Sequence, residues 1–424
     1  MRISELKKKI EDGELSGYSA LYPDLERAKA RFLLAIDRFA AAYGEDRDVF
    51  VLSVSGRSEI SGNHTDHNHG KVIAAAINKD IIAIAAKRED GIIRFRSEGY
   101  SEDVINLEDT ANPDNFENYT SASLIAGMAH GFAIKGYEVG GYDAYSTSDV
   151  LKGSGISSSA AYEVMIGNIF NHLYNDGKIE NYEIAKLAQY AENVFFGKPC
   201  GLMDQMACAV GGFVYIDFED ASAPIVKSID FPLSDMGYSL CIVNTGGNHA
   251  DLNEDYASVP REMKSVASLL GRDVLRGLRE EEILKNINNL RRNVGDRAVL
   301  RALHFLREND RVERIKAALM KKDIDTFFME VCASGDSSFK YLQNVYTNAN
   351  VKEQGISLAL ALADGYLSGK TGAFRVHGGG FAGTVQAFVK NSDVDGYVEL
   401  MDSVFGDGAT EVFTIRDRGA VRLF

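Results

Sequence analysis

The chain has 424 residues, of which 45% are hydrophobic and 25% are charged, and its formal net charge at pH 7 is -15. This composition is typical of an ordinary folded protein and excludes a disordered or fibrous chain. The excess of acidic residues argues against a nucleic-acid partner, because such a partner requires a basic surface. A chain of this length exceeds what one hydrophobic core usually organises, so we expect two packed domains.

The N-terminal segment and the cysteines bear on where the protein works. The segment MRISELKKKIEDGELSGY is charged throughout, unlike a signal peptide, and no apolar run is long enough to span a membrane. None of the four cysteines has the C-x-x-C spacing of a zinc or redox site, which favours free thiols in a reducing compartment. We therefore expect a cytoplasmic protein without a membrane partner, and we expect it to be monomeric.

The first half of the chain is predicted to mix helices and strands. Leu25–Tyr43 places apolar side chains on one helical face, with Asp24 as the N-cap and Gly44 as the stop. Two apolar runs flank Asp90–Gly91, which is a strong signal for a hairpin. Further helices are predicted at residues 119–135, 158–175 and 181–196, and strands at residues 49–55, 81–86, 92–95, 142–148 and 238–245.

Short polar and proline-containing stretches between Asp217 and Met236 mark the best candidate for a domain boundary. We place the boundary near residue 225, which gives an N-terminal domain of residues 1–225 and a C-terminal domain of residues 226–424. The second half is predicted to carry helical stretches at residues 280–308 and 351–367 and a strand at 384–389. Because helices and strands do not alternate strictly, we expect a mixed α/β (α+β) protein.

A glycine- and serine-rich segment from Gly153 to Ser159 follows the strand predicted at residues 142–148 and precedes a long apolar helix. Glycines allow the backbone to approach a phosphate closely, and the first turn of a helix presents unpaired N–H groups. The segment is a candidate phosphate-binding loop, although an ordinary glycine loop with a serine N-cap has the same pattern. It lacks the third glycine of the dinucleotide fingerprint, and Gly365–Thr371 is one residue too short for a Walker A loop.

The segment GRSEISGNHTDHNHG, from Gly56 to Gly70, concentrates charged and polar residues directly after a predicted strand. Its histidines could bind zinc, but strand alternation would point His64 and His67 to opposite faces, and no cysteine or distant histidine cluster completes such a site. A solvated surface turn is a second interpretation, and it suits the end of the segment better than its start.

Four motifs together resemble the galactokinase family, within the larger group of sugar, homoserine, mevalonate and phosphomevalonate kinases. Residues 56–68 resemble the family signature GRVNLIGEHTDYN, and residues 153–161 resemble its phosphate loop GLSSSAA. Residues 191–206, AENVFFGKPCGLMDQM, resemble AEHxFxGxPCGIMDQF, and residues 376–384, VHGGGFAGT, resemble GGGFGGC. The order and spacing agree with the family over most of the chain. The resemblance implies a two-domain sugar-kinase fold, with an N-terminal domain like the second domain of ribosomal protein S5 and a ferredoxin-like C-terminal domain.

The resemblance also implies a role for each matching residue, with ATP and Mg²⁺ as cofactors and a small-molecule sugar as substrate. Asp204 matches the catalytic aspartate and Arg57 the arginine beside it, and Ser159 and Glu192 match the positions that ligate magnesium. The expected sugar-binding residues are Asn63, His64, Thr65, Asp66, Gly201 and Tyr256. The expected ATP phosphate loop is Gly153, Ser154, Gly155, Ile156, Ser157, Ser158 and Ser159.

These residue types suit phosphoryl transfer, which requires an in-line hydroxyl, metal-bridged phosphates and stabilisation of the charge on the moving group. Asp204 could accept the proton of the anomeric hydroxyl, and Arg57 beside it would keep the carboxylate ionised. Without the motif, Asp204 would be interpreted as a helix cap and Glu192 as an exposed helix residue. The expected reaction is the ATP-dependent phosphorylation of the C1 hydroxyl of D-galactose, giving galactose 1-phosphate and ADP.

The chain departs from the family pattern at several positions. The glutamate of the sugar-binding run is Asn63, the tyrosine is His67, and Ala382 and Thr384 replace a glycine and a cysteine. Because asparagine removes a negative charge, a sugar acid such as galacturonate is an alternative substrate. A non-catalytic sugar and ATP sensor is a second alternative, which the intact phosphate loop, Arg57 and Asp204 argue against. A mevalonate-type kinase would share the phosphate loop but not the NHTD run.

Overall fold

A computed structural model describes residues 1–150, 155–247 and 252–424 of the chain. The chain forms two compact units, and each unit combines segments that are distant in sequence. Unit 1 comprises residues 1–57, 76–212 and 416–424, and unit 2 comprises residues 58–75 and 213–415. Strands β1 (Phe50–Ser61) and β2 (Lys71–Lys87) contribute residues to both units. The boundary that we placed at residue 225 stays a prediction.

The sheet of unit 1 has the strand order β12-β1-β2-β5-β3-β4. Strand β3 runs parallel to β5, whereas the pairs β1–β12, β2–β5 and β3–β4 are antiparallel. The other strands of this sheet are β3 (Ile92–Ser97), β4 (Glu102–Asn106), β5 (Tyr142–Ser148) and β12 (Ala420–Arg422).

The hairpin predicted around Asp90–Gly91 is wrong. The chain does turn there, with Gly91 at a φ of 67° and the Asp90 carboxylate accepting a hydrogen bond from the Ile92 N–H. However, β5 lies between β2 and β3 in the sheet. The side chains of β5 are buried from Tyr142 to Ser146, so burial of this strand in the middle of the sheet decides the pairing.

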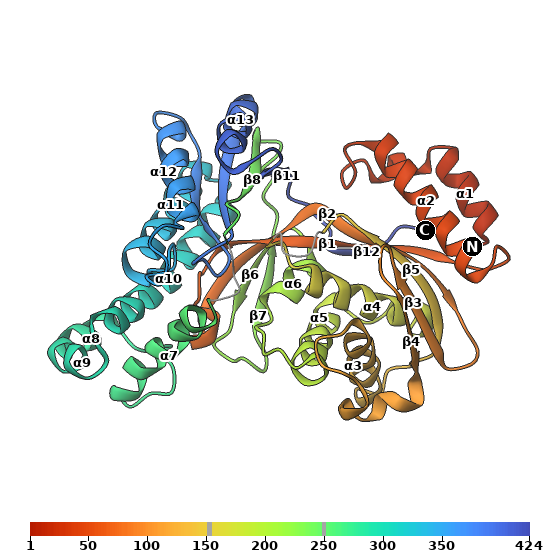
Figure 1. Ribbon diagram of the computed structural model, residues 1–424, viewed down its shortest axis with the longest axis horizontal. Helices are drawn as coiled ribbons and strands as arrows, with labels where there is room; N and C mark the ends of the chain where they lie inside the picture. The colour runs from red at the N-terminus through yellow and green to blue at the C-terminus, as the bar shows by residue number, and fades with distance from the viewer. Residues whose placement is uncertain (151–154, 248–251) are drawn as a thin grey trace. The chain divides into compact units, whose positions relative to one another are not determined.

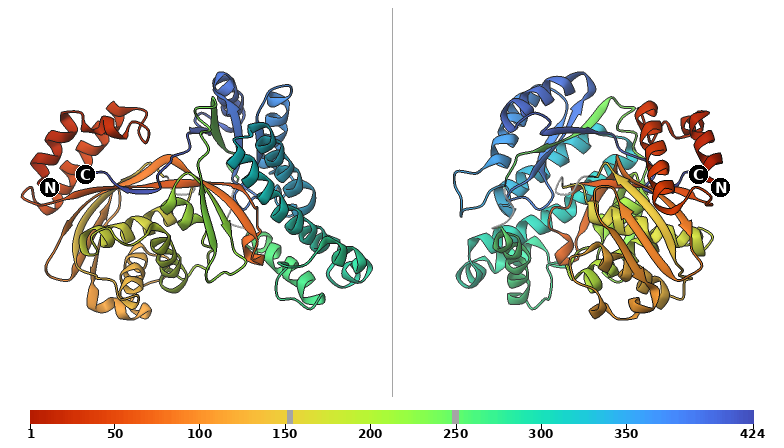
Figure 2. Two further views of the ribbon diagram at one scale, coloured as in Figure 1. Left: turned by 180° about the vertical axis from the view of Figure 1, so that it is seen from behind. Right: turned by 45° about the vertical axis from the view of Figure 1, so that its right-hand side comes forward.

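Helices cover both faces of the unit 1 sheet (Figures 1 and 2). The N-terminal helices α1 and α2 lie on one face, and α3 to α6 lie on the other. Their bounds are α1 (Ile3–Glu11), η1 (Glu14–Tyr18), α2 (Leu25–Tyr43), η3 (Leu107–Ala111), η4 (Pro113–Asn115), α3 (Ser121–Ile134), α4 (Ser158–Tyr174), α5 (Asn181–Tyr190), the π-helix η5 (Ala191–Phe196) and α6 (Met203–Val210).

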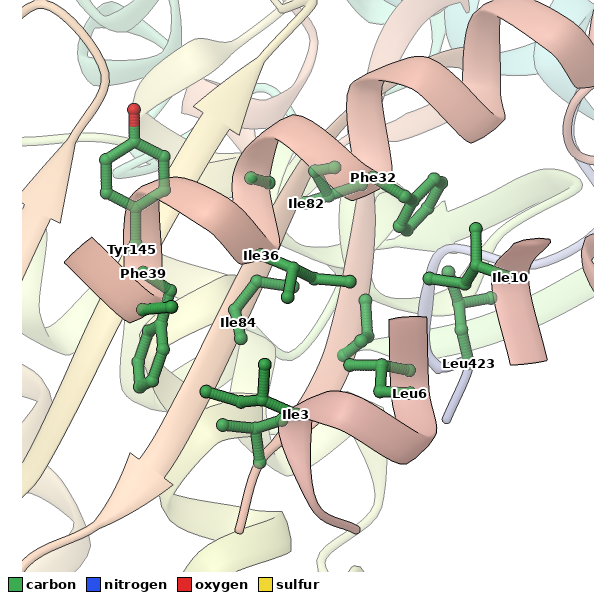
Figure 3. Packing of buried hydrophobic residues seen from close by; sticks show 14 of the residues in the cluster. Ile3, Leu6, Ile10, Phe32, Ile36, Phe39, Ile82, Ile84, Tyr145 and Leu423 are labelled. Carbon is green, nitrogen blue, oxygen red and sulfur yellow. The ribbon is translucent and has the colours of Figure 1, made fainter. Parts of the chain in front are cut away.

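Helix α2 confirms the predicted helix, with its bounds and both ends. The Asp24 carboxylate accepts a hydrogen bond of 3.0 Å from the Arg27 N–H, and the helix stops at Gly44, whose φ of 97° suits glycine. Its apolar face packs on β2 and on α1, as Figure 3 shows for Phe32, Ile36 and Phe39. The first residues of the chain thus belong to the core of unit 1.

Unit 2 contains a four-stranded antiparallel sheet with the order β11-β8-β10-β9. Its other two strands, β6 and β7, pair with each other, and β6 pairs with residues 71–75 of β2. The strands are β6 (Phe213–Asp217), β7 (Ile225–Ile229), β8 (Tyr238–Asn244), β9 (Ala373–His377), β10 (Thr384–Lys390) and β11 (Thr410–Phe413).

The helices of unit 2 pack on both faces of the four-stranded sheet. Helices α12 and α13 pack on the face that carries Val243 and Val389, and α11 packs on the face of Phe388. The stretch predicted as helical at residues 280–308 is divided into three helices at Asn286 and Gly295. The bounds are η2 (Asp66–Asn68), α7 (Asn253–Leu269), α8 (Glu280–Lys285), α9 (Ile287–Val294), α10 (Asp296–Lys321), α11 (Ile324–Ser337), the π-helix η6 (Ser338–Leu342), α12 (Gly355–Leu367), η7 (Asn391–Asp393) and α13 (Val394–Phe405).

Candidate active site

Arg57 and Asp204 form a close ion pair within unit 1. Arg57 lies on β1, and Asp204 lies in the first turn of α6. The Nε of Arg57 donates to Asp204 Oδ1 at 2.8 Å, and its Nη2 donates to Oδ2 at 2.6 Å. The Asp204 side chain keeps 34% of its surface exposed, whereas the Arg57 side chain keeps 10%. The nearly buried guanidinium therefore binds the partly exposed carboxylate through two hydrogen bonds, in a bidentate arrangement.

The described part of the predicted phosphate loop, residues 155–159, reaches this ion pair. Arg57 Nη1 donates to the Gly155 carbonyl at 2.7 Å, and the Arg57 N–H donates to the Ile156 carbonyl at 3.1 Å. The Ser157 hydroxyl donates to Asp204 Oδ2, and α4 begins at the next residue, Ser158. The predicted loop residues Gly153 and Ser154 lie outside the described residues.

Ser157 adopts a left-handed backbone conformation, with a φ of 60° and a ψ of 62°. For a residue with a side chain this conformation costs about 1–2 kcal/mol. Strain of this kind is retained where the surrounding structure requires it. Here it turns the Ser157 hydroxyl onto the Asp204 carboxylate.

The electrostatics of the pair keep Asp204 ionised. Burial alone would raise the pKa of Asp204, but the charge of Arg57 and the hydrogen bonds from Arg57 and Ser157 outweigh burial and lower the pKa below its usual value. The carboxylate is therefore ready to accept a proton at neutral pH. A carboxylate with a lowered pKa is a weak base, so it suits a reaction in which the hydroxyl loses its proton late.

Glu192 lies on the π-helix η5, a short element type that is frequent at functional sites. The side chain is 3% exposed; it accepts hydrogen bonds from Lys198 Nζ at 3.2 Å and from Gln205 Nε2 at 2.7 Å. The same Gln205 nitrogen donates to Glu163 Oε2 at 3.1 Å. Burial and the charge of Glu192 raise the pKa of Glu163 well above its ordinary value.

Two oxygens near Glu192 are buried without a hydrogen-bond partner among the described residues: Glu163 Oε1 and Gln205 Oε1. Each of these oxygens is free to accept a hydrogen bond or to bind a cation. Carboxylate, amide and hydroxyl oxygens are the ligands that Mg²⁺ prefers, so this donor set fits a hard divalent cation. Ser159, the other predicted metal ligand, lies in the first turn of α4 and is partly exposed.

A pocket of about 430 Å³ in unit 1 opens beside the start of α4. Ser158 and Ser159 line it at this end. Tyr119 and Phe196 also line it, and their rings meet edge to face with centroids 5.4 Å apart. Polar groups come from Asp103 and from serines of β3 and β5. The pocket thus combines aromatic walls with a few hydrogen-bonding groups, as sites for flat heterocycles do.

Unit 2 carries most of the predicted sugar-binding residues. The run begins at Gly62, where φ is 96° and a side chain would meet the Lys71 carbonyl at 2.4 Å, so glycine is required. Glu308 of α10 accepts hydrogen bonds from the Gly62 N–H at 2.9 Å and from the Ser61 hydroxyl at 2.8 Å. Burial would raise the pKa of Glu308, but the charge of Arg311 and other contacts lower it to about 2.

Helix α10 also holds the next residue of the run. His304 Nε2 donates to the Asn63 carbonyl at 2.9 Å, and the Ser337 hydroxyl donates to His304 Nδ1 at 2.9 Å. Burial lowers the pKa of His304, so the ring is neutral at pH 7. Thr65 is fully buried and its hydroxyl is 2.8 Å from the Gly62 carbonyl and 2.7 Å from the Lys71 carbonyl.

Three predicted sugar-binding residues bind successive carbonyls of the glycine loop Gly378–Gly380. Asn63 Nδ2 donates to Gly378 O at 2.7 Å, His64 Nε2 donates to Gly379 O at 2.9 Å, and the Tyr256 hydroxyl donates to Gly380 O at 2.8 Å. The first and the fourth of the predicted motifs, residues 56–68 and 376–384, are thereby brought together within unit 2.

The histidines of the run lie close together, and the alternation that we expected for them is wrong. His64 has a φ of 58° and η2 follows, so this segment is a turn and not a strand. The rings of His64 and His67 are 5.9 Å apart between centroids. Burial and the charge of His67 lower the pKa of His64 to about 4. Among the described residues, no group of three His, Cys, Asp or Glu side chains could hold a metal ion.

The remaining predicted residues are placed separately. Asp66 begins η2 and is partly exposed, and its Oδ1 accepts a hydrogen bond from the His67 N–H. Gly201 belongs to unit 1. The preceding residue, Cys200, donates its N–H to Asn193 Oδ1 at 2.7 Å, and its carbonyl accepts a hydrogen bond from Gln189 Nε2 at 3.1 Å.

Several residues that build these sites were not predicted as site residues from the sequence. Histidine and glutamate are common in helices, so nothing in the sequence distinguished His304 and Glu308 from other helical residues. Glu59 could have been identified from the sequence, because it lies inside the family signature at a position where the signature has asparagine. The others are Glu163, Gln205, Asn344 and Arg375, which the fold brings in from distant segments.

Residues 122–212 match the family of GHMP kinases N terminal domains, and residues 37–87 match the galactokinase galactose-binding signature. The first match includes the predicted phosphate loop and Asp204, and the second includes Arg57 and the predicted sugar-binding run. Together with the ion pair and the loop at the start of α4, they define a kinase of the GHMP class.

Similar proteins specify the class further. The galactokinase of Streptomyces coelicolor is 31% identical over 401 residues, which is 91% of this chain and 97% of that protein. The galactokinase of Clostridium tetani is 32% identical over 361 residues, which is 84% of this chain and 88% of that protein. The chain belongs to the galactokinase family, and it is therefore an ATP-dependent sugar kinase.

Solved structures support the expected two-domain sugar-kinase fold. Lactococcus lactis galactokinase complexed with galactose matches with a TM-score of 0.77 at 22% identity, covering 93% of this chain and 100% of that one. A mevalonate kinase matches with a TM-score of 0.60 at 13% identity, covering 87% and 99%. The predicted fold class is confirmed. No helix in residues 1–150, 155–247 and 252–424 is both long and apolar enough to cross a membrane.

Proposed function

We propose that this chain transfers the γ-phosphoryl group of ATP to the anomeric C1 hydroxyl of D-galactose, giving galactose 1-phosphate and ADP. The observation that carries the proposal is the contact of Asp204 with both Arg57 and Ser157. A base, a positive charge and the end of a phosphate-binding loop thus lie within hydrogen-bond distance of one another. Phosphoryl transfer requires these three components at one place.

Each component has a stated task. Asp204 accepts the proton of the C1 hydroxyl, and Arg57 keeps the carboxylate ionised and stabilises charge on the moving phosphoryl group. Residues Gly153 to Ser159 hold the phosphates with backbone N–H groups and with the positive end of α4. Ser159 and Glu192 would hold Mg²⁺, which would neutralise charge on the phosphates, and Gln205 orients the Glu192 side chain by donating a hydrogen bond to it.

The pocket beside α4 is suited to the adenine base. Tyr119 and Phe196 offer ring faces and edges, and Asp103 offers a carboxyl group at the pocket wall. Burial raises the pKa of Asp103 above its usual value. A pocket of this size also suits a single heterocycle.

For the sugar, we propose that His64, Asp66, Gly201 and Tyr256 face the substrate and that Asn63 and Thr65 support them from within. The first four are partly exposed, whereas Asn63 and Thr65 have no exposed surface. Galactose is favoured over galacturonate because the similar proteins described above are galactokinases. A sensor without catalytic activity is disfavoured because the Asp204–Arg57–Ser157 arrangement is complete. We also propose that the protein works as a monomer in the cytoplasm, where its four free cysteines stay reduced.

The test is ADP release by the purified protein with ATP and Mg²⁺, using galactose, galacturonate, N-acetylgalactosamine, arabinose, glucose and mevalonate in parallel. We expect turnover with galactose that is lost in Asp204→Asn. The matched control is Asp176→Asn, since Asp176 is exposed and, among the described residues, its carboxylate pairs with the exposed Lys178. Turnover confined to another sugar would contradict galactose as substrate. Binding without turnover across all compounds would contradict the kinase reaction.

A further inference from the structure

Glu59 and Asn63 carry the residue types of the family signature in exchanged order. Aligned with GRVNLIGEHTDYN, the chain has glutamate at position 59, where the signature has asparagine, and asparagine at 63, where it has glutamate. The exchange conserves one carboxylate and one amide, four residues apart. The two side chains are in contact, since Asn63 Nδ2 donates to Glu59 Oε1 at 2.9 Å.

The amide of Asn63 is fully used by the protein. A side-chain amide has two N–H donors and an oxygen with two acceptor positions. The nitrogen donates to Glu59 and to the Gly378 carbonyl, at 2.9 and 2.7 Å. The oxygen accepts from Asn344 Nδ2 at 2.7 Å and from the Ser338 hydroxyl at 3.3 Å. With four contacts and 0% exposure, the side chain offers no group to a sugar.

The carboxylate of Glu59 is placed where a buried arginine requires it. Arg375 Nη2 donates to Glu59 Oε1 at 3.1 Å, and Arg375 Nη1 donates to the Ile60 carbonyl at 2.9 Å. The exposed fractions are 0% for Arg375 and 6% for Glu59. An asparagine at position 59 would leave the Arg375 charge without this carboxylate, and uncompensated buried charge is costly.

We propose that Glu59 and Asn63 act as one unit that positions the sugar-binding run against the glycine loop, and that Asn63 is a positioning residue and not a sugar ligand. Glu59 orients the Asn63 amide, and the amide fixes the Gly378 carbonyl. His64 and Tyr256 bind the next two carbonyls of the same loop. Glu59 and Asn63 therefore determine the positions of the His64 and Tyr256 side chains. This inference rests on the proposed galactose kinase activity.

A double exchange tests the coupling without relying on activity. The variants are Glu59→Asn, Asn63→Glu and the double variant, and the measurement is the midpoint of thermal unfolding. Asn63→Glu places two carboxylates side by side, and Glu59→Asn removes the partner of Arg375, so each single variant should unfold at a lower temperature. The double variant should recover at least half of the larger loss. Losses that simply add would overturn the coupling.

The matched control is the same exchange at the partly exposed Glu282 and the exposed Asn286, a surface pair at the same spacing. Asn286 Nδ2 contacts the backbone carbonyl of Glu282 and not its side chain. Exchange at these positions should show no recovery in the double variant.

Monodeoxygalactoses separate positioning from direct sugar contact. The variant for this experiment is Ser338→Ala, which removes one donor to Asn63 and should fold even if the single exchanges do not. We expect KM to rise about threefold to fivefold for galactose and by the same factor for each deoxy sugar, with kcat and the KM for ATP unchanged. If Asn63 bound a hydroxyl, the effect would disappear for the one sugar that lacks it, and this result would overturn the proposal. Absence of galactose turnover in the unmodified protein would refute the proposed function alone, because the unfolding experiment would still stand.

Discussion

Arg57 and Asp204, 147 residues apart in the chain, are joined by two hydrogen bonds of 2.8 and 2.6 Å. The guanidinium plane matches the carboxylate with two parallel N–H donors, a geometry that lysine cannot reproduce. The third guanidinium nitrogen donates to the Gly155 carbonyl. One side chain thus aligns the base and the phosphate loop.

Arg57→Lys should therefore lower kcat by about 100-fold, in the range seen when one stabilising donor is removed from a reacting charge. Because Arg57 lowers the pKa of Asp204, the variant should raise this pKa. The acidic limb of the kcat/KM profile should then move to higher pH, since Asp204 must be ionised to accept a proton. The check is a pH–rate profile with Arg38→Lys, an exposed arginine of α2, as the control. An unmoved acidic limb would contradict Asp204 as the titrating base.

Local sequence patterns correctly predicted elements that are stabilised by neighbouring residues. They gave wrong predictions where contacts between distant segments determine the structure. Helix α2 was predicted with both ends, because Asp24 caps it and Gly44 stops it. The hairpin at Asp90–Gly91 was wrong because the burial of β5, a strand some fifty residues further on, separates its two arms. Turn chemistry sets a change of direction but not the partner of a strand.

In the active site, too, the motif residues were predicted from the sequence, whereas their contacts with distant segments were not. Asp204 and Arg57 were identified from motifs, and the structure brings them together. The sequence also showed that Asn63 departs from the signature, but not that its amide is turned toward Glu59, because Asn344 and Arg375 come from segments about 300 residues away. The network around a residue, which depends on tertiary packing, decides whether it contacts a substrate or supports a neighbour.

The backbone of Ser157 gives a prediction that separates stability from activity. Ser157→Gly and Ser157→Ala both remove the hydroxyl that contacts Asp204, so both should reduce kcat by a similar factor of about tenfold or less. Only glycine relieves the strain at a φ of 60°. Ser157→Gly should therefore be more stable than Ser157→Ala by about 1 kcal/mol. Urea unfolding gives the comparison; equal stabilities would show that the left-handed conformation is not kept in solution.

The N-terminal helix should contribute to the stability of unit 1. Leu6 of α1 is 0% exposed and packs in the cluster with Ile36 of α2 and Ile84 of β2 (Figure 3). Leu6→Ala should lower the free energy of unfolding by about 2–5 kcal/mol, through lost burial and the cavity that remains. The control is Glu5→Ala, an exposed neighbour on the same helix, which should change it by less than about 0.5 kcal/mol. A small effect of Leu6→Ala would mean that α1 is detached from the sheet in solution.

Asp80 should make the protein sensitive to acid. Arg31 Nη1 donates to its carboxylate at 2.6 Å, Arg416 Nη1 lies at 3.2 Å, and the hydroxyls of Ser53 and Tyr22 also donate to it. Burial would raise the pKa of Asp80, but the charges of Arg31 and Arg416 outweigh burial and lower the pKa from 3.8 to about 2. A lowered pKa means that the folded state favours the ionised form, which contributes about 2 kcal/mol above pH 4.

This contribution should be lost as the pH falls from about 4 to about 2, when the carboxylate becomes protonated in the folded protein. Asp80→Asn should remove that part of the pH dependence. It should also lower the free energy of unfolding at pH 7 by about 3–5 kcal/mol, because the buried Arg416 and the partly buried Arg31 lose the Asp80 carboxylate. Urea unfolding at pH 7, 4 and 3 measures both effects, with the exposed Asp176→Asn as the control. If the difference between Asp80→Asn and the unmodified protein were the same at pH 7 and pH 3, the lowered pKa of Asp80 would not contribute to stability.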